Sequence, residues 1–194
     1  MMIEIRDESA ATLAEYARIP IAFEVREIFD VATGGDCFVL TERTLDVPYV
    51  KDYDAIGAES PVHWPEHFDL SNWVFLAAYY EGRRVGGAAV AFDTAGLEML
   101  EGRADLAVLW DIRVAPEARG QGVGRGLFRA AEAHAARRGC LQLKIETQNI
   151  NVPACKFYAR QGCALRAVKH LAYTELPHEI QLLWYKELTR DGDA

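Results

Sequence analysis

The chain has 194 residues, 51% of them hydrophobic, and a formal net charge of −8. This length suits one domain with a sizeable core, and no apolar run approaches the ~20 residues that span a bilayer. The acidic balance argues against non-specific nucleic-acid binding, which requires lysine and arginine to neutralise phosphates. We therefore expect no membrane or nucleic-acid partner, and the charge is compatible with a cationic substrate.

The N-terminus and the cysteines indicate a cytoplasmic protein. Residues 1–8 lack the basic region and the apolar core of a signal peptide. The four cysteines show no C-x-x-C pair and no metal-type spacing, so reduced thiols are the simplest interpretation. The five histidines are scattered along the chain, and we infer no metal.

The first 70 residues are interpreted as a variable N-terminal elaboration of a single domain spanning 1–194. Apolar residues at helical spacing predict a helix over Asp7–Arg18. The β-rich runs Phe23–Val31 and Cys37–Leu45, joined by a turn at Thr33–Asp36, predict a hairpin. Asp46–Phe68 carries several acids and three prolines, and predicts a long, partly irregular connection that forms part of a substrate pocket.

Residues 73–188 are expected to form the core of the fold. A strand, a helix and a second strand in succession predict a β-α-β crossover with parallel neighbouring strands, while the remaining hairpins are antiparallel. The predicted fold is therefore a mixed, mostly antiparallel α/β sheet with a central parallel β-α-β unit and flanking helices. The expected strands are Trp73–Tyr80, Val85–Asp93, Leu106–Val114, Leu141–Thr147, Ala164–Tyr173 and Glu179–Leu188; the expected helices are Val123–Arg138, ended by Gly139, and Asn151 to Gly162.

A glycine-rich stretch, Arg119-Gly120-Gln121-Gly122-Val123-Gly124-Arg125-Gly126, stands between the third of these strands and the first helix. Glycine lets a backbone approach a ligand closely, and the first N–H groups of a helix form an anion site. The stretch has neither the Lys-Ser/Thr of a Walker loop nor the third glycine of the dinucleotide pattern. It does fit R-x-x-G-x-G, through Arg119, Gly122 and Gly124. A plain glycine-rich turn is the alternative.

This pattern resembles the acetyl-CoA pyrophosphate loop of the GNAT N-acetyltransferase superfamily. Thr147–Cys163 is similar to the family segment N-x-x-A-x-x-F-Y-x-x-x-G-F. The overlapping run E-T-Q-N-x-N-x-x-A-C-K-F-Y over Glu146–Tyr158 is most similar to streptothricin acetyltransferases. Two residues depart from the pattern: Cys163, where an aromatic residue is usual, and Trp110, where those enzymes usually carry glutamate.

The resemblance implies acetyl-CoA as co-substrate and direct acetyl transfer to an amine, with no covalent intermediate. It implies that Tyr158 protonates the departing thiolate and that Asn151 contacts the pantetheine arm. Asp111 or Glu146 would accept the amine proton. The implied acetyl-CoA contacts are Ile112, Arg113, Val114, Arg119, Gly120, Gln121, Gly122, Val123, Gly124, Arg125, Gly126, Asn151 and Tyr158.

Each catalytic candidate also has a purely structural explanation. Tyr158 is adjacent to Phe157 and could be a core aromatic residue. Asp111 and Glu146 could be half-buried carboxylates paired with Arg113 or Lys144. The sequence leaves the identity of the base open.

The resemblance favours an N-acetyltransferase for a small cationic amine, of which a streptothricin-like antibiotic is one candidate. A protein N-terminal or lysine acetyltransferase is the alternative within the same chemistry. A non-catalytic acetyl-CoA-binding module is the alternative of another class, although such a module has no need of Tyr158. The sequence does not define the acceptor or the oligomeric state, and a homodimer is compatible with it.

Overall fold

The computed structural model describes residues 2–34, 37–56 and 60–189. The chain divides into two compact units. The first is made of residues 1–22, 52–143 and 187–194, and the second of residues 23–51 and 144–186.

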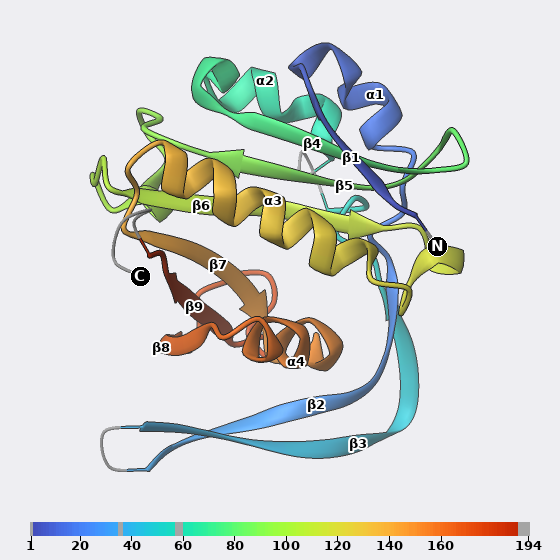
Figure 1. Cartoon of the computed structure of the whole chain (residues 1–194). Coiled ribbons are helices and arrows are strands. Elements are labelled where there is room, and N and C mark those ends of the chain that lie inside the picture. Colours follow the sequence, from blue (N-terminus) through green and yellow to red (C-terminus); the bar gives the residue numbers. More distant parts are fainter. Residues whose placement is uncertain (1, 35–36, 57–59, 190–194) are drawn as a thin grey trace. The chain divides into compact units, whose positions relative to one another are not determined.

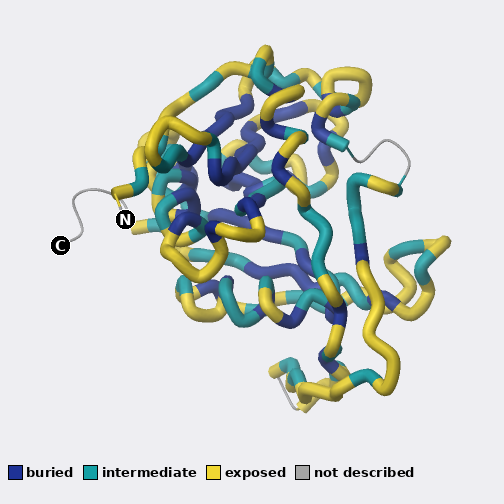
Figure 2. Tube along the Cα trace, turned by 90° about the vertical axis from the view of Figure 1, so that its right-hand side faces the viewer, coloured by how far each residue is buried: buried dark blue, intermediate teal, exposed yellow. Residues whose placement is uncertain are grey.

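The first unit contains four strands of the seven-stranded main sheet, in the order β1-β4-β5-β6 (Figure 1). Each neighbouring pair among them is antiparallel. The sequences of β4 and β5 are almost continuously apolar because both strands are buried along most of their length, whereas β3 (Cys37–Lys51) of the second unit is largely exposed; Figure 2 colours the chain by burial. Their bounds are β1 Glu4–Glu8, β4 Val74–Tyr80, β5 Arg83–Ala91 and β6 Leu106–Val114.

Two consecutive glycines of β5 let helices pack closely on both faces of this sheet. A Cβ atom at Gly86 would lie 2.9 Å from Val123 of α3 (Val123–Arg137). A Cβ atom at Gly87 would lie 2.5 Å from the ring of Tyr16 in α1 (Leu13–Tyr16). Successive residues of a strand point to opposite faces, so α3 and α1 cover opposite sides of the sheet.

The face that carries α1 also holds a buried aromatic cluster. Tyr16, Trp64, Trp73 and Phe75 are at its centre, and Phe68, Leu70, Met99 and Trp110 pack against it. Short helical turns supply several of these side chains: η1 Ala10–Thr12, η2 Pro61–His63, α2 Trp64–His67, η3 Leu70–Asn72 and η4 Glu98–Leu100.

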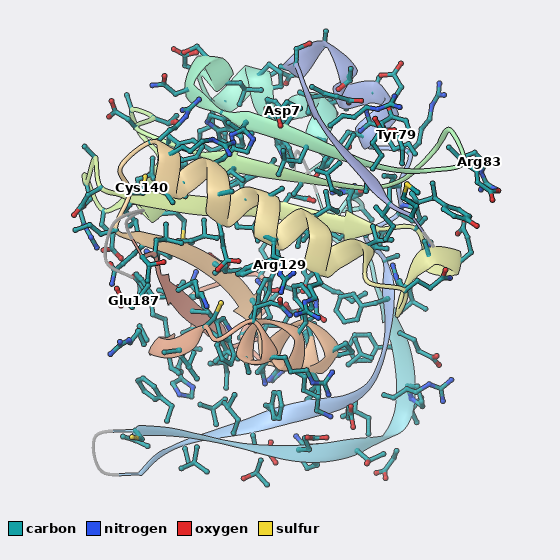
Figure 3. The ribbon with its side chains drawn as sticks, in the orientation of Figure 1. Asp7, Tyr79, Arg83, Arg129, Cys140 and Glu187 are labelled. Carbon is teal, nitrogen blue, oxygen red and sulfur yellow. The ribbon has the colours of Figure 1, made fainter. Side chains whose placement is uncertain are left out.

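The helix predicted over Asp7–Arg18 is wrong in its first part. Glu4–Glu8 forms β1, which pairs with β4, and only η1 and the four-residue α1 are helical. Side chains reinforce the strand pairing: Tyr79, labelled in Figure 3, donates its hydroxyl to Glu8 over 2.7 Å and lies beneath the guanidinium of Arg6. Pairing with a buried strand thus overrides the local helical pattern.

The connection that leaves the end of β6 and passes through α3 brings the chain back beside the residue that precedes β6. The Leu141 N–H donates to the Asp105 carbonyl over 2.7 Å, just before β6 begins at Leu106 and β7 (Gln142–Gln148) begins at Gln142. The two strands therefore start side by side and run in parallel, as the sequence predicts. Gly139, with φ +79°, ends α3.

The second unit contains the sheet order β7-β9-β8 and a separate two-stranded hairpin, β2-β3. Here α4 (Val152–Arg160) follows β7, and Gly162, with φ +80°, ends it. The remaining strands are shorter or longer than expected because their pairing partners set their limits: β8 Ala164–Lys169, β9 Gln181–Glu187, β2 Phe23–Gly34 and β3 Cys37–Lys51.

The hairpin is tied to the rest of the second unit by Asn149, which is 3% exposed. Its Nδ2 donates to the Phe29 carbonyl of β2 over 3.0 Å, and its Oδ1 accepts from the Ile180 N–H over 2.8 Å. A buried ion pair of 2.5 Å, Lys51–Glu179, holds the far end of β3. The predicted connection at Asp46–Phe68 is therefore wrong over residues 46–51, which continue β3. Part of the turn predicted at Thr33–Asp36 lies outside the described residues.

The fold class predicted from the sequence is confirmed. The main sheet is mostly antiparallel, includes a parallel pair and is flanked by helices.

Candidate active site

The first half of the glycine-rich stretch, Arg119–Gly122, forms the turn between η5 (Pro116–Ala118) and α3, and its second half, Val123–Gly126, is the first turn of α3. Gly120 and Gly122 have φ +73° and +89°, and a Cβ atom at either would meet nothing within 4 Å. Gly122 is the N-cap of α3, and having no side chain it leaves the first N–H groups of the helix uncovered by a cap. An exposed turn with open space beside its backbone and a helix N-terminus suits a diphosphate.

Two long side chains of this turn bond to carbonyls nearby. Arg119 donates from Nε to the Val114 carbonyl over 3.1 Å and from Nη2 to the Ala22 carbonyl over 3.2 Å. Gln121 donates from Nε2 to the Glu117 carbonyl over 2.8 Å. These bonds fix the path of the turn, so the Arg119 guanidinium acts in this structure as a brace for the loop.

A β-bulge interrupts β6 just before the segment that the resemblance assigns to the acyl group. Ala89 of β5 faces Asp111, but Val90 faces Leu109, so Trp110 is the extra residue. Trp110 packs edge-to-face on Phe68 and Trp73 of the aromatic cluster, with ring centroids 5.3 and 5.6 Å away. The bulge therefore turns two consecutive side chains, Trp110 and Asp111, toward the α1 face.

On that face Asp111 belongs to a cluster of four bonded side chains, called here the Arg113 cluster: Tyr16, Asp54, Asp111 and Arg113. The Tyr16 hydroxyl donates to Asp111 Oδ1 over 2.8 Å. Arg113 donates to both oxygens of Asp111, to both oxygens of Asp54 and to the Ile19 carbonyl. The side chain of Arg113 is 1% exposed, and those of Asp111 and Asp54 are 7% and 22% exposed.

Burial and charge shift the pKa values in the Arg113 cluster. Burial, followed by the negative charge of Asp111, raises the pKa of Tyr16 well above its usual range. Burial alone would lower the pKa of Arg113, but Asp111 and Asp54 outweigh it and raise that pKa. Tyr16 therefore stays neutral and Arg113 stays charged at physiological pH. Two carboxylates against one guanidinium leave one negative charge in excess within the cluster.

In the second unit, the other predicted residues lie around α4. Asn151 is its N-cap, and its side-chain oxygen accepts from the Ala154 N–H over 3.2 Å. Tyr158, two turns along the helix, is 5% exposed and makes an edge contact with the ring of Phe157. The predicted N-cap is confirmed; the catalytic and cofactor roles of both residues stay predictions.

Glu146 of β7 accepts hydrogen bonds from neutral groups. Tyr173 donates over 2.6 Å, Gln181 over 2.8 Å and Gln148 over 3.3 Å. Its setting differs from that of Asp111, because proton uptake by Glu146 breaks none of the described ion pairs.

The structure thus brings the predicted residues together in two groups, one in each unit. The first contains Asp111, Arg113 and the glycine turn, and the second contains Glu146, Asn151 and Tyr158. The sequence did not reveal Tyr16 and Asp54 as partners of Asp111 and Arg113. Only the acidic character of Asp46–Phe68 pointed toward Asp54, and no local pattern marks Tyr16.

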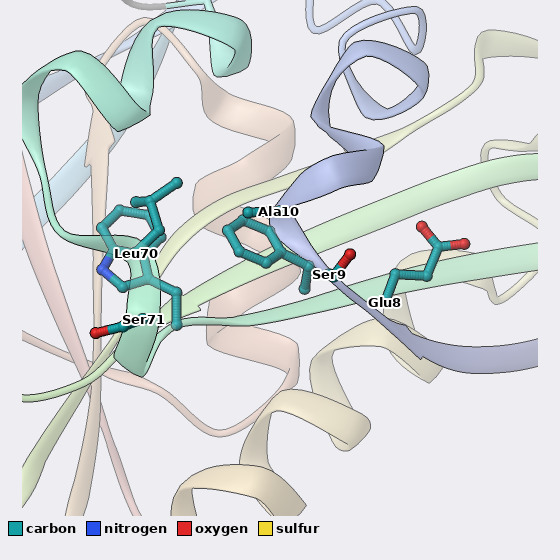
Figure 4. A pocket seen from close by; sticks show the side chains of 7 residues that line it. Glu8, Ser9, Ala10, Leu70 and Ser71 are labelled. Atoms are coloured by element: carbon teal, nitrogen blue, oxygen red, sulfur yellow. The ribbon is translucent and has the colours of Figure 1, made fainter.

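A separate cavity of about 440 Å³ lies in the first unit (Figure 4). The cavity is lined by Glu8, Ser9, Ala10, Leu70, Ser71, Trp73 and Phe75, and none of the residues predicted for the site is among them.

The described residues contain no group of three or more His, Cys, Asp and Glu side chains that could hold a metal ion. Among the same residues, every helix is too short or too polar to span a membrane.

Comparison with known proteins gives a consistent result. Residues 42–163 match the model of the acetyltransferase (GNAT) family. The chain is 32% identical to streptothricin acetyltransferase of Streptomyces lavendulae, over 78% of this chain and 76% of that protein. It is 31% identical to the Escherichia coli streptothricin acetyltransferase, over 84% of each.

Two solved structures extend the likeness over nearly the whole chain. The crystal structure of nourseothricin acetyltransferase is 26% identical, with a TM-score of 0.76, over 97% of this chain and 100% of that one. A putative streptothricin acetyltransferase from Bacillus anthracis str. Ames, in complex with acetyl coenzyme A, is 22% identical with a TM-score of 0.77, over 96% and 99%, and shows the shared fold.

Proposed function

The chain belongs to the GNAT acetyltransferase family, and from this premise we propose that it transfers an acetyl group from acetyl-CoA to a primary amine of a small cationic acceptor, a streptothricin-type antibiotic. The observation that carries the proposal is the turn at Gly120 and Gly122. Its left-handed backbone, its open surroundings and the N-terminus of α3 together suit the diphosphate of acetyl-CoA. The relatives at 31–32% identity, named streptothricin acetyltransferases, support the choice of acceptor.

The first unit would bind and polarise the acetyl donor. The turn from Arg119 to Gly126 holds the diphosphate through backbone N–H groups, with the side chain of Arg119 bracing the turn. The backbone of Ile112–Val114 follows the bulge in β6 and offers hydrogen bonds to the pantetheine and the thioester carbonyl. Donors aimed at that oxygen stabilise the charge that develops on it as the amine attacks.

The family motif assigns proton transfer to a residue of α4. The thiolate of CoA gains a proton as it leaves, and Tyr158 has the hydroxyl that the family motif assigns to this step. Asn151 caps the same helix and is assigned to the pantetheine arm.

Glu146 is the better candidate for the base that accepts the amine proton. Asp111 is held by a buried guanidinium, so its protonation would weaken an ion pair inside the protein. Glu146 receives hydrogen bonds from neutral donors and can take up a proton without that loss.

The acidic residues of the segment Asp46–Phe68 favour a cationic acceptor. Asp54, within that segment, is part of a cluster that carries one excess negative charge. A protein substrate and a non-catalytic role remain the alternatives. Cytoplasmic location, a single-domain organisation and a homodimer stay predictions.

The direct test is acetyl transfer followed by mass spectrometry. Purified protein, acetyl-CoA and a panel of streptothricin, polyamines, neutral amines and peptides are incubated, and each product is weighed. Streptothricin carrying one added acetyl group, formed faster than any acetylated peptide, is expected. Acetylation confined to peptides would replace the antibiotic with a protein substrate, and no acetylated product at all would support the non-catalytic role.

A further inference from the structure

Trp110 differs from the other three tryptophans of the chain, all of which lie within the described residues. Trp64, Trp73 and Trp184 are 3%, 6% and 5% exposed, whereas Trp110 has intermediate exposure. The indole is nevertheless held firmly, by edge-to-face contacts with Phe68 and Trp73. A large aromatic side chain that is fixed and still accessible is suited to ligand contact.

The position of Trp110 in β6 connects it with the reaction. It is the extra residue of the β-bulge, and Ile112 follows two residues later, in the segment proposed to face the thioester. The bulge also gives Trp110 the same orientation as Asp111, toward the face that holds the Arg113 cluster. An accessible indole therefore shares a sheet face with a cluster that carries one excess negative charge.

We propose that Trp110 binds the cationic part of the acceptor, through a cation–π contact, and so sets the preference of the enzyme for charged amines. This inference rests on the proposed acetyltransferase activity and adds a specificity-determining residue to it. The excess negative charge of the Arg113 cluster attracts the same cation from nearby. A contact of this kind changes affinity by about 2- to 30-fold, depending on how far the cation is desolvated.

The test compares Trp110→Leu and Trp110→Phe with the parent enzyme. Leucine keeps an apolar side chain without a π face, so KM for streptothricin is expected to rise about tenfold. Phenylalanine keeps a weaker π face, so the KM of Trp110→Phe should lie between those of the parent and of Trp110→Leu. The affinity of both variants for acetyl-CoA, measured by calorimetry, should stay within twofold of that of the parent. If streptothricin is not a substrate, the most rapidly acetylated charged amine of the panel takes its place, so failure of the antibiotic leaves this test intact.

Tryptophan fluorescence supplies a readout that packing alone does not move. Titration of the parent with the acceptor, without acetyl-CoA, should change the emission, and Trp110→Phe should abolish that change. Trp73→Phe is the matched control: it alters a buried neighbour and the hydrogen bond to Thr94, so it should lower the melting temperature while keeping the fluorescence response.

Two results would overturn the proposal. One is a Trp110→Leu enzyme that melts like the parent and keeps its KM within twofold. The other is an equal rise in KM in Trp73→Phe, which would show that the aromatic cluster acts only through its packing. Should Trp110→Leu fail to fold, the fluorescence comparison between the parent and Trp110→Phe decides alone.

Discussion

Arg113 holds both carboxylate oxygens of Asp111, two positions earlier on the same strand, through hydrogen bonds of 2.6 and 3.0 Å. Asp111 is therefore tied to a guanidinium that is almost completely buried. This relationship separates the two candidates for the catalytic base, which the sequence alone leaves equivalent.

Replacing each candidate by its amide should give opposite results. Asp111→Asn leaves Arg113 short of a charged partner, and we expect the free energy of unfolding to fall by about 3 kcal/mol or more. Glu146→Gln should melt close to the parent but lose about 10² or more in kcat. Denaturant unfolding and steady-state kinetics measure the two effects. A stable, inactive Asp111→Asn protein beside an active Glu146→Gln protein would instead identify Asp111 as the base.

Binding of acetyl-CoA should depend on the backbone of Gly122. Gly122→Ala forces a side chain onto a residue with φ +89° and into the open space beside the turn. We expect about 1–2 kcal/mol of lost stability from the strained backbone and at least a tenfold loss of acetyl-CoA affinity by calorimetry. Gly96→Ala, at φ +78° with equally open surroundings, is the matched control and should lose only stability. Equal acetyl-CoA affinity in both variants would show that the turn does not bind acetyl-CoA.

Tyr158→Phe tests the proposed general acid. The ring stays, so the packing of this 5% exposed side chain should survive, while kcat should fall by about 10² with little change in acetyl-CoA affinity. The measurement is steady-state thiol release, accompanied by a thermal melt. Phe157→Leu changes the other ring of the same aromatic pair and should keep kcat near that of the parent. A Tyr158→Phe enzyme that melts normally and works within threefold of the parent would assign Tyr158 to packing.

Gly87 should be intolerant of any side chain. A methyl group there would lie 2.5 Å from Cε2 of Tyr16, so Gly87→Ala should destabilise the protein by about 1–3 kcal/mol. A double-mutant cycle with Tyr16→Ala checks the cause by denaturant unfolding. The loss of unfolding free energy caused by Gly87→Ala should be smaller in the Tyr16→Ala background, where the ring is absent. An unchanged loss would show that the methyl group clashes with another group, for instance the Leu76 carbonyl.

Tyr16 should also make stability sensitive to alkaline pH. Burial and the charge of Asp111 raise its pKa in the folded state, so its contribution is fully present below its unfolded pKa near 10 and is lost as pH rises toward the folded value. Above pH 10, the free energy of unfolding should fall more steeply with pH in the parent than in Tyr16→Phe. The difference between the two slopes should reach up to about 1.4 kcal/mol per pH unit. Parallel pH profiles for the two proteins would contradict a buried, neutral Tyr16.

Strong local signals made much of the fold predictable from the sequence. Apolar runs bounded by turns marked β4, β5 and β6, and Asn151 marked the start of α4. Gly139 and Gly162 marked the ends of the two long helices, and both adopt the left-handed backbone that favours glycine there. These features depend on residues close together in the chain.

Features that depend on distant partners could not be predicted. The segment Glu4–Glu8 has four charged residues in five and becomes a strand only because β4 offers it an edge. Tyr16 and Asp111 are 95 residues apart, and no local pattern connects them. The orientation of Trp110 depends on a bulge, and a bulge is defined by the partner strand as much as by its own sequence.

The tie between Asn149 and the hairpin has a consequence for the order in which the protein can be completed during synthesis. Asn149 and Phe29 are 120 residues apart, and Lys51 and Glu179 are 128 apart. The hairpin is synthesised before both of its anchors, and a two-stranded ribbon alone is at best marginally stable in water. Until Asn149 and Glu179 have been synthesised, the nascent hairpin therefore lacks both anchors and is accessible to proteases and to other nascent chains.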